Sequence, residues 1–260
     1  MITLLTDFGS ADYFVGSVKG VILSIDPLSQ IIDISHEVPP HDIQFAAFTL
    51  GACFAEYPEG TVHLAVVDPG VGTSRRVIAV NAARHYFVGP DNGIFTFIYT
   101  RDPQARVFHA DHPSFFRFLP SSTFHGRDIF APLAARLDLG HRIENVGHPI
   151  EDFVKLPIHE PSFDADGRVI GEIIHIDRYG NCVTNLTKLH LDSKGAYSLS
   201  IGGTNIGLIA DNYTDSKNAG QPILYYGSAG YWEIGVWCDS ASRTLGLSRG
   251  MRFNLRQLLK

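Results

Sequence analysis

The stretch of residues 63–76, HLAVVDPGVGTSRR, joins a predicted buried strand to a charged loop. An apolar run that ends in Asp68 is typical of a strand with a carboxylate at its tip. A proline and two glycines then turn the chain, and Arg75 and Arg76 follow. A loop that only reverses the chain needs neither charge. The pair of Asp68 and Arg75 therefore predicts either a structural ion pair, worth about 0–1 kcal/mol at a surface, or a site that holds a reacting atom. Arg76 is expected to point elsewhere, into solvent.

The segments around this stretch alternate between strand and helix patterns. Apolar runs predict strands over residues 2–8, 30–36 and 61–68. Helical spacing predicts helices over residues 13–25, 42–57 and 126–140, the last one stopped by Gly140. Residues 75–93 read as a strand pair closed by a turn. Alternating strands and helices imply an α/β domain with a mainly parallel sheet that is covered on both faces.

The pattern changes near residue 155. A segment rich in Pro, Asp and Gly comes first, and short alternating apolar runs separated by Gly and Asn follow it. Such runs indicate a small all-β, barrel-like domain. A chain of 260 residues suggests about two domains. We expect an α/β domain over residues 1–155 and a β-barrel domain over residues 165–260.

Composition restricts the partners. The net charge of −6 argues against a nucleic acid, which needs clustered Lys and Arg. No apolar run approaches the roughly 18 residues that a membrane span requires. The chain opens as a strand rather than a signal peptide, so a cytoplasmic protein is expected. Three widely spaced cysteines give neither a disulfide framework nor a zinc knuckle.

Several polar residues fall where ligands bind in such folds. Asp7, Ser35 with His36, and Asp68 follow predicted parallel strands, and ligands bind beyond the carboxyl ends of those strands. Asp7 could accept hydrogen bonds from a ribose diol, or it could cap the next helix. His125 precedes a predicted helix and suits acid–base work near neutral pH, although a structural role is the alternative.

Other candidates are weaker. Arg127 and Asp128 fall in a helix's first turn, where Asp favours the dipole. No histidine pair forms an HExxH motif, and His36, His41 and Asp42 make only a minor metal candidate because two prolines interrupt them. In the second half, Asp177 and Asn181 flank one glycine turn, and Ser228 lies among small residues in another. Ordinary turn chemistry is the alternative for both loops.

Six segments, in this order along nearly the whole chain, resemble the S-adenosyl-L-methionine (SAM) hydroxide adenosyltransferases: TDFG, VVDPGVGT, GPDNG, STFHGRDIFAP, DRYGNCVTN and GYWEI. This is the SAM-hydrolase branch of a superfamily that also contains SAM-dependent fluorinases and chlorinases. The resemblance implies an α/β N-terminal domain, a C-terminal β-barrel, and a homotrimer that binds its substrate between one subunit's N-domain and a neighbour's C-domain.

The resemblance also implies residue roles. Asp68, Arg75 and His125 match a catalytic triad in which Arg75 stabilises developing hydroxide, Asp68 orients the attacking water and His125 accepts or relays its proton. Asp7 matches the residue that holds the ribose hydroxyls. Asn181 matches a contact to adenine and Asp177 a carboxylate near the methionine amine. Further matches to adenosine or methionine contacts are Ser228, Glu233 and Val236.

The expected reaction is hydrolysis of SAM to adenosine and L-methionine, with SAM as substrate, no cofactor and no metal ligand. One alternative is a halogenase that makes 5′-chloro-5′-deoxyadenosine. The halogenating relatives carry a tyrosine where Asp68 stands and a tryptophan where His41 aligns, and the fluorinases have an N-domain insertion that this chain lacks. A second alternative is a non-catalytic sensor of SAM or adenosine, and a third, more remote one is a metal-dependent hydrolase.

Overall fold

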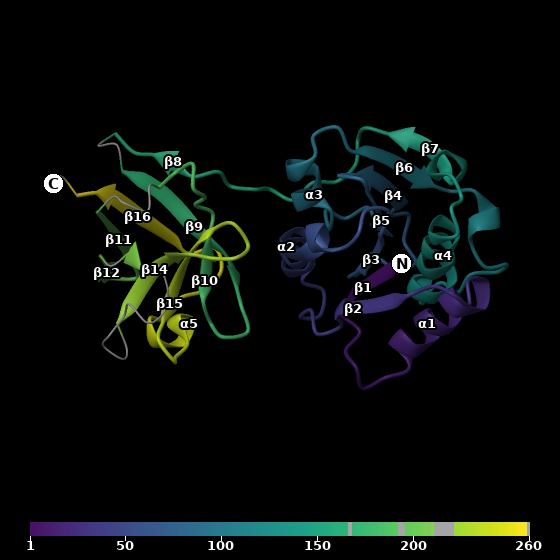
Figure 1. Ribbon diagram of the computed structural model, residues 1–260, viewed down its shortest axis with the longest axis horizontal. Coiled ribbons are helices and arrows are strands. Elements are labelled where there is room, and N and C mark those ends of the chain that lie inside the picture. Colours follow the sequence, from purple (N-terminus) through teal and green to yellow (C-terminus); the bar gives the residue numbers. More distant parts are fainter. Residues whose placement is uncertain (166–167, 192–195, 208, 211–220, 259–260) are drawn as a thin grey trace. The chain divides into compact units, whose positions relative to one another are not determined.

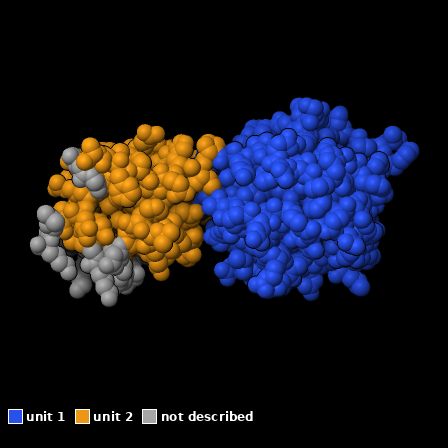
Figure 2. All heavy atoms as spheres, turned by 90° about the horizontal axis from the view of Figure 1, so that it is seen from above, with its two compact units in different colours: residues 1–156 blue, residues 157–260 orange. Residues whose placement is uncertain are grey.

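The structure is a computed structural model that describes residues 1–165, 168–191, 196–207, 209–210 and 221–258 (Figure 1). The chain divides into two units, residues 1–156 and residues 157–260 (Figure 2). Each unit has its own hydrophobic core. No helix in the described part of the chain has the length and apolar character needed to cross a bilayer.

A seven-stranded sheet forms the centre of the first unit, with the order β2-β1-β3-β5-β4-β6-β7. Its strands are β1 (Ile2–Thr6), β2 (Ile31–Ser35), β3 (Val62–Val66), β4 (Val77–Ala82), β5 (His85–Pro90), β6 (Arg106–Ala110) and β7 (Gly147–Ile150). The predicted strands at 2–8, 30–36 and 61–68 are thereby confirmed, and these three lie side by side and parallel.

Helices cover both faces of this sheet (Figure 1). The α-helices are α1 (Phe14–Ile25), α2 (Ile43–Cys53), α3 (Thr96–Arg101) and α4 (Ala131–Asp138). Successive residues of a strand point to opposite faces. Leu4 and Leu64 accordingly pack in one cluster with side chains of α1 and α4. Leu5 and Ala65 pack in another with α2 and α3. Both faces of the central strands are buried against helices, which explains the continuous apolar runs of these strands.

The expectation of a mainly parallel sheet is wrong. The sheet is mixed, because β4 pairs antiparallel with both β5 and β6, and β6 pairs antiparallel with β7. β4 and β5 are joined by Ala83 and Arg84, whose φ angles of 48° and 65° are those of a two-residue hairpin turn. A parallel connection would need a crossover of about a dozen residues or more. The turn therefore fixes the antiparallel half of the sheet.

The second unit is mainly β, as expected. Its strands are β8 (Ser162–Phe163), β9 (Val169–Ile176), β10 (Cys182–Thr184), β11 (Tyr197–Ile201), β12 (Thr204–Ile206), β13 (Ile209–Ala210), β14 (Pro222–Tyr226), β15 (Trp232–Val236) and β16 (Arg252–Gln257), with one short helix, α5 (Ala241–Thr244). They form one sheet in the order β12-β11-β16-β9-β10-β15-β14-β13, with β8 beside β9. This open, curled sheet packs Leu199, Ile234 and Phe253 into a shared core, as a half-barrel does.

Candidate active site

Asp68 lies just beyond the carboxyl end of β3, and its side chain is almost completely buried. The strand end is held in place because the Asn92 side chain donates a hydrogen bond to the Val67 carbonyl at 2.8 Å. Arg75 closes the loop by donating from Nε to Asp68 Oδ1 at 2.9 Å and to Oδ2 at 3.1 Å. Its Nη2 also contacts Asp68 Oδ2. The sequence pair is therefore a bidentate, buried ion pair rather than a surface one.

The glycine at position 72 lets this loop fold against a neighbouring segment. Gly72 has a φ of +80°, which favours glycine. A Cβ atom added there would lie 2.5 Å from the backbone oxygen of Ser122. Ser122 precedes His125 by three residues, so Gly72 allows the Asp68 loop and the His125 loop to touch.

Arg75 also contacts His125, which lies 50 residues away in the sequence. Arg75 Nη2 is 2.7 Å from His125 Nδ1. A guanidinium can only donate, so Nδ1 accepts and the proton of the neutral ring is on Nε2. The guanidinium also lies over the Phe130 ring, with Cζ 5.0 Å from the ring centroid. Arg75 thus aligns a carboxylate and an imidazole in one cluster.

Burial lowers the pKa of His125, and the positive charge of Arg75 lowers it further. His125 immediately precedes a single π-helical turn, Gly126–Phe130, that runs into α4. In that turn Asp128 is buried and accepts hydrogen bonds from Arg127 Nε at 2.7 Å and from the Ser121 backbone at 2.9 Å. Asp128 therefore anchors the loop that leads to His125, a role that a helix-dipole interpretation of the sequence does not include.

A cavity of about 290 Å³ joins these groups to Asp7, and Asp68 and His125 both line it. One wall is aromatic. The Phe8 and Phe124 rings are 6.0 Å apart and the Phe14 and Phe124 rings 5.2 Å apart between centroids. Sequence reasoning missed this wall, although the aromatic residues next to the first strand and opening α1 were its signal. Polar groups thus face an apolar wall, the usual composition of a small-molecule pocket.

Asp7 follows β1 at the same edge of the sheet as Asp68. Its Oδ2 accepts a hydrogen bond from the His41 backbone N–H at 2.9 Å. The N-cap residue of α1 is Tyr13, which makes no side-chain capping bond, so the helix-capping alternative for Asp7 does not apply. The His41 contact orients the carboxylate of Asp7 at the cavity.

The metal site weighed for His36, His41 and Asp42 is not found among the described residues. Asp42 caps α2 by accepting from the Phe45 N–H at 2.9 Å. His36 contacts Thr6 at 2.8 Å and Asp33 at 3.0 Å instead. The expectation that Arg76 is solvated is also wrong, since its guanidinium pairs with Asp91 at 2.7 Å and with Asp152 at 2.7 Å. Arg76 does point away from the Asp68 cluster.

In the second unit, Asp177 and Asn181 form one tight turn. Asp177 accepts from the Asn181 backbone at 2.8 Å and from its side-chain amide at 2.9 Å. Asn181 and Val236 line a cavity of about 620 Å³ together with the exposed ring of Tyr179. The loop and the strand end named from the sequence therefore meet at one cavity.

Ser228 and Glu233 are not among the described residues that line this cavity. Ser228 is exposed in the turn between β14 and β15. Glu233 is buried on β15 and accepts a hydrogen bond from the Tyr225 hydroxyl at 2.5 Å. Burial raises its pKa, and the Asp177 carboxylate adds to the rise. Gly227 gives Glu233 its space, because a Cβ atom there would overlap the carboxyl group.

The fold and the first cavity together define a class of protein: a two-unit α/β and β protein with an Asp–Arg–His cluster beyond a parallel strand. Comparison with known families is more specific. Residues 2–147 match the model of the SAM hydroxide adenosyltransferase N-terminal domain, and residues 171–254 match that of the C-terminal domain. The chain belongs to the SAM hydroxide adenosyltransferase family.

Individual relatives agree with this. The (R)-S-adenosyl-L-methionine hydrolase of Thermus thermophilus is 37% identical over 98% of both chains. Three further relatives, 34% to 40% identical, carry the same name. A fluorinase from Nocardia brasiliensis is more distant, at 24% identity over 98% of this chain and 96% of its own. A crystal structure of an uncharacterized conserved protein from Thermotoga maritima has a TM-score of 0.90 at 36% identity, over 98% of this chain and 99% of that one.

Proposed function

We propose that the protein hydrolyses SAM to adenosine and L-methionine, and that the (R) epimer is its substrate. The observation that carries this proposal is the buried Asp68–Arg75–His125 cluster, whose Asp68 and His125 line a cavity together with Asp7. The names of the relatives at 34% to 40% identity support the reaction and the epimer. The water oxygen forms a bond to ribose C5′ while the C5′–S bond breaks. The electron pair of the C5′–S bond stays on sulfur.

The leaving group departs as a neutral thioether, so it needs no proton. Bulk water, with a pKa of about 15.7, is far too weak an acid for a carboxylate to ionise. Asp68 instead orients the water by accepting one hydrogen bond. Its carboxylate takes the proton once the forming C–O bond has made the oxygen acidic. Positioned base assistance of this kind contributes about 10²–10⁴ in rate.

Arg75 holds the Asp68 carboxylate in position and also contacts His125. Arg75 fixes both Asp68 oxygens and occupies His125 Nδ1. Because the ring proton is then on Nε2, His125 acts first as a hydrogen-bond donor in the cavity, and it can pass a proton on only afterwards. This modifies the role that the sequence alone suggests for His125. The apolar wall of Phe8, Phe14 and Phe124 excludes water, which strengthens the attraction between the nucleophile and the sulfonium.

The remaining candidate residues are assigned to parts of the substrate. Asp7 Oδ2 is held by His41, which leaves Oδ1 to accept from the ribose hydroxyls. In the second unit we assign Asn181 to adenine and Val236 to the same cavity, with Asp177 holding Asn181 in place. On the strength of the family resemblance, Asp177 is also proposed to lie near the methionine amine. Ser228 and Glu233 remain proposed contacts on the strength of the family resemblance. The same resemblance supports a homotrimer, which light scattering on the intact protein would test.

Kinetics of four variants test the assignment. Asp68→Asn and Arg75→Lys should each lower kcat by about 10²–10⁴, because Asn offers a weaker acceptor and Lys lacks the fork that reaches two groups. Asn181→Ala should chiefly raise KM. Arg76→Ala is the matched control: it removes the neighbouring arginine, whose partners lie off the cavity, and should keep kcat. Adenosine is followed by chromatography from each SAM epimer.

Near wild-type kcat in both Asp68→Asn and Arg75→Lys would refute the catalytic roles. Formation of 5′-chloro-5′-deoxyadenosine in high chloride would instead identify a halogenase. Binding of SAM without any product would identify a sensor. The carboxylate at position 68 argues against the halogenase, since it repels a halide and attracts water.

A further inference from the structure

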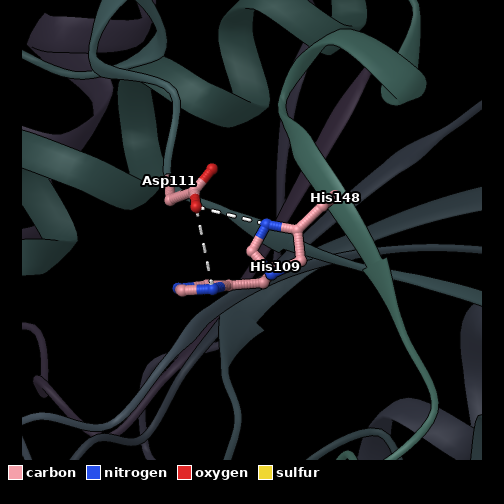
Figure 3. A group of neighbouring side chains, drawn as sticks. All are labelled: His109, Asp111 and His148. Atoms are coloured by element: carbon pink, nitrogen blue, oxygen red, sulfur yellow. Dashed lines mark ion pairs between the residues drawn. The ribbon is translucent and has the colours of Figure 1, made fainter.

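Three side chains at the far edge of the first unit's sheet converge outside the proposed active site (Figure 3). His109 is on β6 and His148 is on β7, and the two residues are directly opposite each other in the antiparallel pair. Asp111 follows β6 by one residue, so it shares a side with His109 by the two-residue period of a strand. None of the three is among the residues that line the cavity of Asp68.

One carboxylate oxygen faces both imidazoles. His148 Nδ1 is 3.2 Å from Asp111 Oδ2, and His109 Nδ1 is 4.0 Å from the same oxygen. The three ligand atoms lie within 4.8 Å of one another, and this is the one group of three such donors found in the described part of the chain. Ligands bound about 2.0–2.2 Å from Zn²⁺ in a tetrahedron lie roughly 3.4 Å apart. The observed spacings approach that value without any change in the backbone.

The backbone favours this convergence. Gly147 lies opposite Ala110 in the strand pair. A Cβ atom at position 147 would lie 2.7 Å from Asp111 Oδ1 and would also overlap the His109 carbonyl. The Asp111 N–H donates to the Val146 carbonyl at 3.1 Å, which holds the residue against the start of β7. The glycine therefore gives the carboxylate its place between the two rings.

We propose that His109, Asp111 and His148 bind a divalent first-row cation of the Zn²⁺ class. Two imidazoles and one carboxylate are ligands that suit Zn²⁺. Exposure of 28%, 49% and 59% for the three side chains leaves the fourth coordination position open to water. The ion ties β7, a four-residue strand at the edge of the sheet, to β6. Its role is structural, and it takes no part in SAM hydrolysis.

Calorimetric titration of the intact protein with ZnCl2 tests this site. We expect one ion per chain, and at least about tenfold weaker binding in His148→Ala and in Asp111→Asn. His159→Ala is the matched control. His159 is 57% exposed and pairs with Glu172 at 2.9 Å, yet it belongs to no group of three donors among the described residues. This control should bind Zn²⁺ as the unaltered protein does.

Thermal unfolding gives a second readout. A ligand that binds only the folded state raises Tm, so Zn²⁺ should raise Tm in the unaltered protein and in His159→Ala but not in His148→Ala. Adenosine release should be the same in all of them. Absence of Zn²⁺ binding in the unaltered protein, or equal affinity in His148→Ala, would overturn the proposal and leave the three residues as a cluster of ion pairs.

Discussion

Arg75 shows how one side chain can define a site. It donates to Asp68 through Nε and to His125 through Nη2, at 2.9 Å and 2.7 Å. An ion pair of this kind contributes little to stability compared with an apolar replacement of the same size, because both groups lose their hydration. The ion pair instead fixes the positions of the two side chains that Arg75 contacts. It gives His125 a defined tautomer and points Asp68 at the cavity.

The tautomer of His125 leads to a pH prediction. Burial and Arg75 lower its pKa below the ordinary value of about 6.5. The neutral form, which accepts from Arg75, is therefore present at neutral pH and is lost as pH falls through the lowered pKa. We expect kcat/KM to be level above about pH 6.5 and to decrease in acid.

Variants identify the group responsible. His125→Asn keeps an acceptor for Arg75 but cannot be protonated, so its lower activity should lack the acid limb. His112→Asn changes an exposed histidine that bonds Ser114 and lies off the cavity, so it should retain the limb. An unchanged acid limb in His125→Asn would assign the titration to another group.

Among the elements, the loop after β3 depends on a glycine as well as on its charges. Gly72 combines a φ of +80° with the contact to Ser122, whereas Gly60 has a φ of +83° and open space. Alanine in the left-handed region costs about 1–2 kcal/mol at either position. Only Gly72→Ala should also push the Asp68 loop away from the His125 loop.

The two variants are therefore a matched pair. Gly60→Ala should lower the free energy of urea unfolding by about 1–2 kcal/mol, and Gly72→Ala should lower it by more because its Cβ meets the Ser122 carbonyl. Only Gly72→Ala should also lower kcat by at least about tenfold, since small misplacements of reacting groups cost rate. Equal kcat in the two variants would show that the loop tolerates displacement.

The π-helical turn after His125 is a second device of local structure. π turns inside helices are rare and occur mostly at functional sites. Here the turn Gly126–Phe130 precedes α4, and it places Phe130 beneath the Arg75 guanidinium. The sequence pattern predicts a regular helix over residues 126–140. The apolar pattern fits both forms, so only the tertiary contacts of Asp128 and Phe130 select the wider turn.

At the scale of the whole molecule, two buried histidines couple the stability of the first unit to pH. His63 contacts Thr3 at 2.7 Å and His85 at 3.1 Å within the sheet. Burial lowers the pKa of His63 to about 3, and His85 adds to the effect. The unfolded chain therefore binds a proton on this residue between about pH 6.5 and pH 3, while the folded chain does not.

The resulting change of stability with pH has a definite sign. The contribution of His63 to stability is complete above about pH 6.5 and is lost as pH falls toward 3. Loss of this contribution should lower the free energy of unfolding by roughly 2–3 kcal/mol between pH 7 and pH 4.5. Urea unfolding at both pH values measures this.

His63→Asn should be less stable at pH 7 but show a smaller loss on acidification. His159→Asn, at an exposed position, should keep the original loss. The same pH dependence in His63→Asn and in the unaltered protein would mean that other groups dominate the acid response.

The sequence by itself determined the local structure. Apolar runs predict β1 and β2 and helical spacing predicts α1 and α2, because a strand or helix must bury its apolar side chains. The sequence also placed Asp7 and Asp68 at the ends of parallel strands. The six motifs identified the family, and three of them contain Asp7, Asp68 and His125, which line one cavity of the first unit.

Only the tertiary structure decided how distant segments pair. The sheet is mixed because β4 runs antiparallel to both β5 and β6, and local spacing is the same for a parallel and an antiparallel strand. The contact between Arg75 and His125, the aromatic wall and the cluster of His109, Asp111 and His148 likewise join residues far apart in the chain. Such contacts depend on the register between strands and on the packing of loops, and neither is written in the periodicity of a single segment.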